Sequence, residues 1–314
     1  MVGTAFHGLW LYLFIIKYDM EIAGLAYANM LSTTIIFILL MTFTYRQPEL
    51  RDAWILPDRR IFNGLGDYIG LAIPMTIMIC LDWWVWEFMI LMSGYLGVVD
   101  QASQIIIMHI VALAYMVSIG FESSSCALVG QEIGRGDVKN AKLYFGTIKF
   151  ISVICLGLLS LAVYVFKSQL ILIFTEHGQT IEKINTVIWI ISFNTFPDCY
   201  KGMLKGIIKA LGVQKYCAYI NISGHWCINL TLQYYLGFYL EMGLKGLWLA
   251  KLVNEFYIMV MYSLLTAYTD WDRISTEARN RQIQKIEADK ATMLTKSDRQ
   301  GAEIGGSPYR RGED

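Results

Sequence analysis

Hydrophobic residues gather along the chain into long runs that short polar stretches separate. The runs are about 20 residues long and are not amphipathic stripes, which is typical of helices that cross a membrane. They predict eight helices, at residues 5–16, 22–45, 67–94, 102–130, 143–166, 184–210, 216–240 and 246–268. The pattern therefore predicts an all-α, polytopic membrane protein with about eight transmembrane helices.

Positively charged residues follow alternate loops between these helices. They are Arg46, Arg51, Arg59 and Arg60, then Arg135, Lys139 and Lys142, then Lys205, Lys209 and Lys215. Because positive residues stay on the cytoplasmic side, both termini are predicted to be cytoplasmic in a multi-pass protein. The pattern does not choose between the plasma and the vacuolar membrane. A net charge of zero, with 55% hydrophobic and 17% charged residues, argues for a lipid bilayer and against a nucleic-acid partner.

The cysteines and the known catalytic motifs point away from enzyme chemistry. All six cysteines fall within the predicted helices and form no CxxC pair, so neither a disulfide framework nor a metal site is predicted. GxSxG, HExxH and phosphate-loop motifs are absent from the sequence. We therefore expect a protein that is not an enzyme and that needs no cofactor.

A weak internal repeat divides the chain. "YLFIIKYDMEIAGLAYA" at 12–28 aligns without a gap to "YYLGFYLEMGLKGLWLA" at 234–250, an offset of 222 residues, with Gly24 facing Gly246. Duplicated halves are typical of secondary transporters. The repeat predicts one complete six-helix lobe preceded by the last two helices of another lobe. The predicted domains are 1–45 (last two helices of an N-terminal lobe), 46–66 (cytoplasmic inter-lobe linker), 67–269 (C-terminal six-helix lobe) and 270–314 (cytoplasmic tail, partly disordered).

Four carboxylates stand out within the apolar helices: Asp82, Glu87, Glu122 and Asp198. Each costs ~2.5 to 3.5 kcal/mol at mid-membrane, so it needs a partner, a proton or a wet cavity. Burial favours the protonated form, which suits a group that takes up and releases protons as access alternates. A structural role is the alternative, since a buried carboxylate can accept hydrogen bonds from a nearby lysine. Glu255 can do so with Lys251, and Asp198 with Lys201, each pair one helical turn apart.

Aromatic residues and prolines accompany these acids. Trp83, Trp84 and Trp86 surround Asp82, and Tyr115 and Trp226 lie on other predicted helices; beside a carboxylate, such rings favour flat organic cations. The alternative is that the rings form interfacial belts. Pro74 and Pro197 each precede an acid on the same helix and permit a bend there, although membrane helices also tolerate proline without such a role.

Several of these segments resemble the multidrug and toxic compound extrusion (MATE) family. "CLDWWVWEFMILMSG" resembles its seventh-helix signature, "ALVGQEIGRGDVKNAK" the turn after its eighth helix, and "FPDCYKGMLKGIIKALGVQKYCAYIN" its tenth and early eleventh helices. "GLKGLWLA" and "TDWD" resemble the twelfth helix and its exit. The resemblance implies two six-helix lobes that export organic cations, driven by protons or sodium. It makes Asp82, Glu87 and Asp198 the expected proton- and cation-coupling residues.

The sequence departs from the family pattern at three places. Lys201 stands where a glutamine is usual and can compete with a cationic substrate, and Glu122 replaces a small or hydroxylic residue. "HWCINLT" lacks the proline expected to bend the eleventh helix.

We expect a secondary active antiporter that exports organic cations or other xenobiotics in exchange for protons, with sodium as the alternative ion. The substrate cavity is expected to include Trp83, Trp84, Trp86, Glu122, Tyr115, Trp226 and Lys201, with Pro74 and Pro197 as hinges. Two alternatives remain: a truncated, non-transporting partner of a full-length transporter, and a lipid flippase of the same superfamily.

Overall fold

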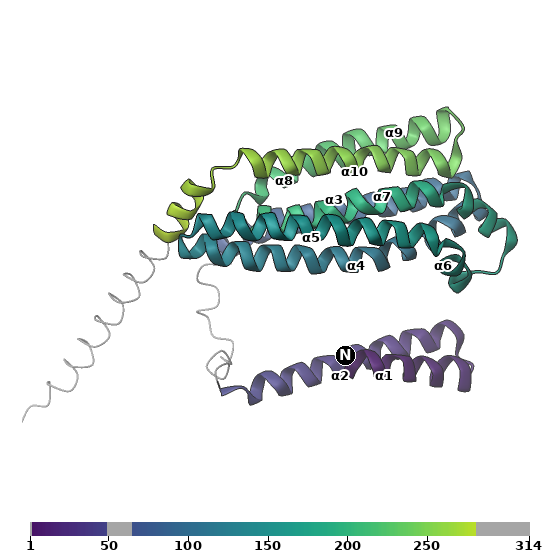
Figure 1. Ribbon diagram of the computed structural model, residues 1–314. Helices are drawn as coiled ribbons and strands as arrows, with labels where there is room; N and C mark the ends of the chain where they lie inside the picture. Colours follow the sequence, from purple (N-terminus) through teal and green to yellow (C-terminus); the bar gives the residue numbers. More distant parts are fainter. Residues whose placement is uncertain (1, 49–64, 281–314) are drawn as a thin grey trace, which may run out of the picture. The chain divides into compact units, whose positions relative to one another are not determined.

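The computed structural model describes residues 2–48 and 65–280, which fold into helices joined by short turns. The chain divides into two compact units, Met1–Ala72 and Ile73–Asp314. The described part of the first unit is mainly a helical hairpin, drawn in purple in Figure 1. Its elements are α1 (Val2–Leu11), the π-helical segment η1 (Tyr12–Lys17) and α2 (Glu21–Arg46).

The second unit is a bundle of long helices that run lengthwise beside one another, with the short α6 at one end (Figure 1). Its elements are α3 (Leu65–Leu96, which starts before the unit boundary), α4 (Val98–Arg135), α5 (Val138–Val165), α6 (Lys167–Phe174), α7 (Gly178–Ala210), α8 (Gln214–Asn221), η4 (Ile222–Asn229), α9 (Leu230–Tyr234), η5 (Tyr235–Tyr239) and α10 (Gly243–Tyr268). A further helical stretch covers 271–280.

The prediction of an all-α, polytopic membrane protein is confirmed. Each of the eight predicted helices is present, and α8, η4, α9 and η5 together form the one predicted at 216–240. Among the described residues, three helices are long and apolar enough to cross a membrane by length and composition alone: Glu21–Arg46, Val98–Arg135 and Val138–Val165. The short helix α6 was not predicted, and α7 begins at Gly178 rather than 184. Most of the predicted linker (49–64) and tail (281–314) lies outside the described residues.

Helix α7 is the centre of the second unit, where it packs against α4, α5 and α10. Its glycines allow the closest approach. A Cβ atom on Gly202 would lie 2.0 Å from Ser118 Oγ, and one on Gly206 would lie 2.2 Å from the carbonyl oxygen of Glu122. Ser118 Oγ also donates a hydrogen bond to the carbonyl oxygen of Cys199, at 2.9 Å. Small residues four apart are what allow membrane helices to bring their backbones into contact, so this spacing fixes α7 on α4.

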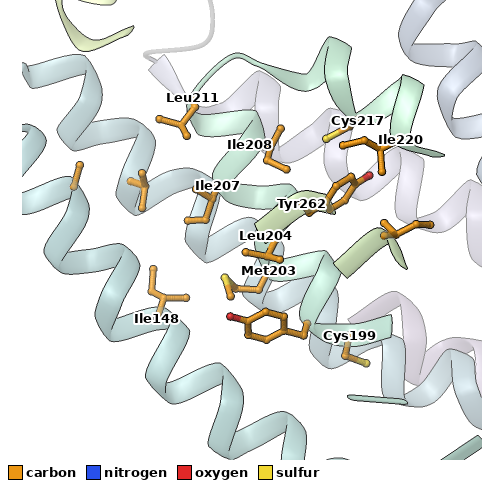
Figure 2. Close-up of a cluster of buried hydrophobic side chains, with 14 of the residues drawn as sticks. Ile148, Cys199, Met203, Leu204, Ile207, Ile208, Leu211, Cys217, Ile220 and Tyr262 are labelled. Carbon is orange, nitrogen blue, oxygen red and sulfur yellow. The ribbon is translucent and has the colours of Figure 1, made fainter. Parts of the chain in front are cut away.

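Apolar side chains from α5, α7 and α10 fill the space around this contact. Figure 2 shows Met203, Leu204 and Ile207 of α7 near Ile148 of α5 and Tyr262 of α10, all buried. The Tyr262 hydroxyl donates a hydrogen bond to Asn221 Oδ1 at 2.6 Å, so the polar end of this ring is satisfied inside the cluster. A second buried cluster joins α3, α4, α7 and α10 around Met89 and Trp248.

The α4–α5 turn is fixed by its own sequence and by the stretch 271–280. Gly136 ends α4 in the left-handed conformation (φ 85°), and the Asp137 side chain accepts a hydrogen bond from the Asn140 backbone N–H at 3.0 Å. The buried Ser275 hydroxyl donates to the Ile133 carbonyl at 3.0 Å. Trp271 packs on a ring from α5, so 271–280 is docked on the end of the bundle opposite α6 (Figure 1).

The predicted repeat is visible in the backbone of both hairpins. In the first hairpin the N–H of Tyr18 bonds to the carbonyl of Leu13 at 3.0 Å; in the last, the N–H of Leu240 bonds to the carbonyl of Tyr235 at 2.9 Å. A second pair of bonds also matches, Met20 to Phe14 at 3.0 Å and Met242 to Leu236 at 3.2 Å. Each residue in the bonds of the last hairpin follows its counterpart in the first by 222 positions, which is the offset of the sequence alignment. The two segments therefore share one turn structure.

The left-handed residues of the two turns match as well. Asp19 (φ 52°) corresponds to Glu241 (φ 52°), and Glu21 (φ 44°) corresponds to Gly243 (φ 58°). Non-glycine residues seldom adopt this conformation, so its recurrence at Asp19 and Glu241 supports the predicted repeat. Both turns also follow a π-helical segment, η1 in one hairpin and η5 in the other.

Candidate functional site

A network of buried charges joins α7 to α10. Asp198 of α7 is 3% exposed, and Lys201 Nζ lies 3.0 Å from its Oδ1. The same ammonium group also donates a hydrogen bond to Glu255 Oε2 on α10. Lys201 therefore bridges two carboxylates that lie 57 positions apart in the sequence.

Glu255 has a second lysine on its other side. Its side chain is 0% exposed, and Lys251 Nζ donates to Glu255 Oε1 at 2.6 Å. Lys251 also lies over the Trp86 ring, 4.1 Å from its centroid, where the ring face attracts the cation. Two carboxylates and two ammonium groups thus balance one another, which a buried cluster of charges requires. The pairings predicted for Lys201 with Asp198 and for Lys251 with Glu255 are confirmed.

Helical spacing places these residues. Asn194, Asp198 and Lys201 are spaced by four and then three positions on α7, so they form one stripe, and Lys251 and Glu255 are four apart on α10. Pro197 lies inside α7, next to Asp198. A proline cannot donate the helical hydrogen bond that would otherwise reach four residues back, so α7 is weakened beside the charged stripe.

The helix between α7 and α10 in the sequence is interrupted by two π-helical segments. The first, η4, contains His225, whose Nδ1 lies 2.9 Å from Asn254 Nδ2 of α10. Gly224 makes this approach possible, because a Cβ there would lie 2.8 Å from Asn254 Oδ1. Such π segments are frequent at functional sites. The first of them, η4, contains the first five residues of "HWCINLT".

Several buried amide side chains near these elements lack partners. Within the described part of the chain, Asn194, Asn229 and Gln233 are buried and neither polar atom of any of them has a hydrogen-bond partner. Leaving such a group unsatisfied costs about 1 to 3 kcal/mol, so these amides call for water or a polar ligand. Sequence reasoning missed them, although the spacing of Asn194 from Asp198 was a usable signal.

The structure brings some predicted site residues together and separates others. Trp86 joins the charge network, and Trp84 contacts Trp226 edge-on, with 6.4 Å between ring centroids. Tyr115 of α4 is near enough to interact electrostatically with Lys201.

Other predicted site residues lie apart from the network. Trp83 is 64% exposed and Glu87 is also exposed, whereas Glu122 is paired with Lys209 of α7. Asp82 and Pro74 lie on α3, but their side chains are outside the described residues.

A separate hollow of about 490 Å³ lies on α4 and α5. Its walls are mostly apolar and contain none of the charged network; they are formed by Val117, Gly120, Phe121, Ser124, Ile148 and Ile151. Within 2–48 and 65–280, histidine, cysteine and acidic residues form no group of three or more that could hold a metal ion.

Comparison with known proteins gives a consistent result. A family model described as MatE matches residues 74–235, more than half of the 314-residue chain. The human Multidrug and toxin extrusion protein 2 is 28% identical over 285 residues, which is 89% of this chain and 46% of the human protein. Protein DETOXIFICATION 8 of Arabidopsis thaliana is 26% identical over 283 residues, covering 90% of this chain and 58% of that protein. The chain thus spans about half the length of the curated relatives it matches.

The fold agrees with the sequence comparison. The crystal structure of the eukaryotic MATE transporter AtDTX14 superposes with a TM-score of 0.81 at 20% identity, covering 89% of this chain and 63% of that chain. The likeness extends over both units, and the matched region of the family model contains the stripe with Asp198 and Lys201. This chain belongs to the MATE family of transporters.

Proposed function

We propose that the chain is a secondary active antiporter that exports organic cations in exchange for protons. The observation that carries the proposal is the buried carboxylate Asp198, set between helices in a network whose charges balance. An acid retained at such a cost in a membrane helix is by default a functional group. Membership of a transporter family and the weakened helix at Pro197 support the same reading.

Three acids carry the exchange in this proposal: Asp82, Glu87 and Asp198. A proton arriving from outside neutralises a carboxylate and releases the bound cation, and loss of the proton inside restores the negative charge. The aromatic residues Trp83, Trp84, Trp86, Tyr115 and Trp226 supply ring faces and apolar contact to the substrate. Glu122 and Lys201 set the local charge, and Pro74 and Pro197 permit bending.

The membrane potential contributes to this cycle only when more protons enter than monovalent cations leave. One charge moving through 100 mV provides ~2.3 kcal/mol, roughly a fifty-fold concentration ratio. The exchange of one proton for one monovalent cation uses only the pH gradient, whereas two protons also use the potential.

Transport in proteoliposomes tests the proposal. Vesicles that contain the full chain are loaded with an organic cation and given an inward pH gradient, and efflux is compared with that of Asp82→Asn and Asp198→Asn. We expect efflux to follow the pH gradient and to fall at least tenfold in each variant, with Asp272→Asn, on the docked stretch 271–280, as the matched control. Efflux that is unchanged by the pH gradient and by both substitutions would contradict the proposal. Efflux that follows an imposed sodium gradient instead would identify sodium as the coupling ion.

A further inference from the structure

The charge network has an unusual feature: its negative charges are already occupied. Asp198 and Glu255 carry two negative charges, and Lys201 and Lys251 carry two positive ones. A carboxylate that receives a cationic ligand needs a free negative charge. In this lobe the chain itself supplies the cation.

Exposure shows which group an incoming ligand meets first. The Lys201 side chain is 17% exposed, whereas that of Asp198 is 4% and that of Glu255 is 0% exposed. Lys201 is therefore the most accessible member of the pair that it forms with Asp198. A cation that approaches Asp198 meets the ammonium group before it meets the carboxylate.

The network also offers Lys201 a second position. Its ammonium already donates to Glu255 as well as lying within 3.0 Å of Asp198, so it can leave one carboxylate without losing the other. Lys251 remains on the opposite oxygen of Glu255 at 2.6 Å and is held in place by the Trp86 ring. A small shift of one flexible side chain would thus free Asp198.

We propose that Lys201 is a specificity-determining residue: its ammonium group occupies Asp198 as a tethered cation, and an external cation binds this carboxylate only by displacing Lys201 toward Glu255. The inference rests on the proposed function, since it concerns how the same lobe recognises its substrate. It makes the site weak for permanent monovalent cations, because displacement of the ammonium group breaks its ion pair with Asp198.

Equilibrium binding without any gradient tests this inference. The probe is phenyltrimethylammonium, whose charge does not change with pH, and it is titrated into the purified full chain in lipid nanodiscs. Lys201→Gln removes the tethered charge. We expect it to tighten binding by roughly tenfold or more, because the attraction between opposite charges in a partly buried site is much larger than the thermal energy. Lys201→Arg keeps the charge and should bind as weakly as the unmodified chain.

Two further variants separate charge competition from altered folding. Lys201→Gln combined with Asp198→Asn should lose the gain, because the freed carboxylate is gone. Lys183→Gln is the matched control: Lys183 is another lysine of α7 paired with an acid on a different helix, Asp100, at 2.9 Å, and its loss should leave probe binding unchanged. If Lys201→Gln alone does not fold, Lys201→Gln with Glu255→Gln removes one charge of each sign and should still bind the probe more tightly than the unmodified chain.

The inference is overturned if a folded variant that lacks Lys201 binds the probe no better than the unmodified chain. It is also overturned if the gain persists without Asp198. Either result leaves proton-coupled transport standing, because that proposal is judged by efflux under a pH gradient. Conversely, efflux that is independent of protons would leave the binding comparison intact.

Discussion

The first and last hairpins of the chain share one turn and differ in their surroundings. In both, a glycine at the start of the second helix lies against the preceding helix: Gly24 near the backbone of Phe14, and Gly246 near that of Leu236. The buried positions of α2 are Gly24, Ala28 and Ser32, and their counterparts at the offset of 222 are buried in α10 as well. The stripe that faces the hairpin partner is thus common to both.

A second face distinguishes the two helices. Leu247 and Leu244 of α10 are 0% and 1% exposed, because α10 also packs against α7. Their counterparts on α2, Leu25 and Ile22, are 46% and 83% exposed. The turn persists whether or not this second face is covered, so the turn is encoded by the local sequence. The chemistry of the second face depends on its neighbours, and α10 has charges there that α2 lacks.

The two hairpins are expected to differ most in the stability that is lost on substituting Glu255 and its α2 counterpart, Thr33. Glu255→Gln leaves Lys251 without a carboxylate partner and Lys201 with Asp198 alone, and breaking a buried pair costs about 3 to 5 kcal/mol. Thr33 is exposed, so Thr33→Val should change stability by no more than about 0.5 kcal/mol. Thermal unfolding of the chain in nanodiscs measures both. Equal losses of stability in Glu255→Gln and Thr33→Val would contradict this expected difference.

A smaller difference is expected at the two glycines. A Cβ on Gly246 would lie 2.5 Å from the carbonyl oxygen of Leu236, so Gly246→Ala forces the backbone apart and should cost about 1 to 3 kcal/mol. The equivalent contact at Gly24 is 3.0 Å, so Gly24→Ala should cost less. Hydrogen exchange of amides in 12–28 and 234–250 reports each hairpin separately. A larger loss of protection in the first hairpin would contradict the ranking.

The smallest effect is expected at the left-handed residues that follow the turns. Glu21 has φ 44° where its counterpart Gly243 has φ 58°, and a non-glycine residue there carries about 1 kcal/mol of strain. Glu21→Gly should therefore stabilise the first hairpin by about that amount, and Gly243→Ala should destabilise the last one similarly. Amide hydrogen-exchange rates in 12–28 and 234–250 show whether each substitution raises or lowers the stability of its hairpin. Ala23→Gly, inside α2, should have the opposite effect to Glu21→Gly.

Local patterns in the sequence predicted a large part of this structure. Long apolar runs located the eight helices, because a membrane helix must satisfy its backbone within itself. The four-residue spacing of Lys251 and Glu255 predicted their pairing. The alignment of 12–28 with 234–250 predicted a shared turn, which the matched hydrogen bonds of Tyr18 and Leu240 now display.

Other features depend on contacts between distant segments. Lys201 and Glu255 are 54 residues apart, and no local rule pairs them, so the bridge between α7 and α10 was not predicted. Helix α6 has eight residues, too few to give a periodic signal. The π segments were missed because their hydrogen-bond register leaves no distinct mark in residue type. The roles of Asp82, Glu87 and Asp198 in coupling remain predictions.

The contact of Gly202 and Gly206 with α4 also bears on the network that joins α7 to α10. A side chain at either position would collide with α4, so the two helices are held at a close approach. Asp198 and Lys201 lie on α7, whereas Glu255 lies on α10. Any separation of α10 from α7 would therefore have to break the ion pair between Lys201 and Glu255.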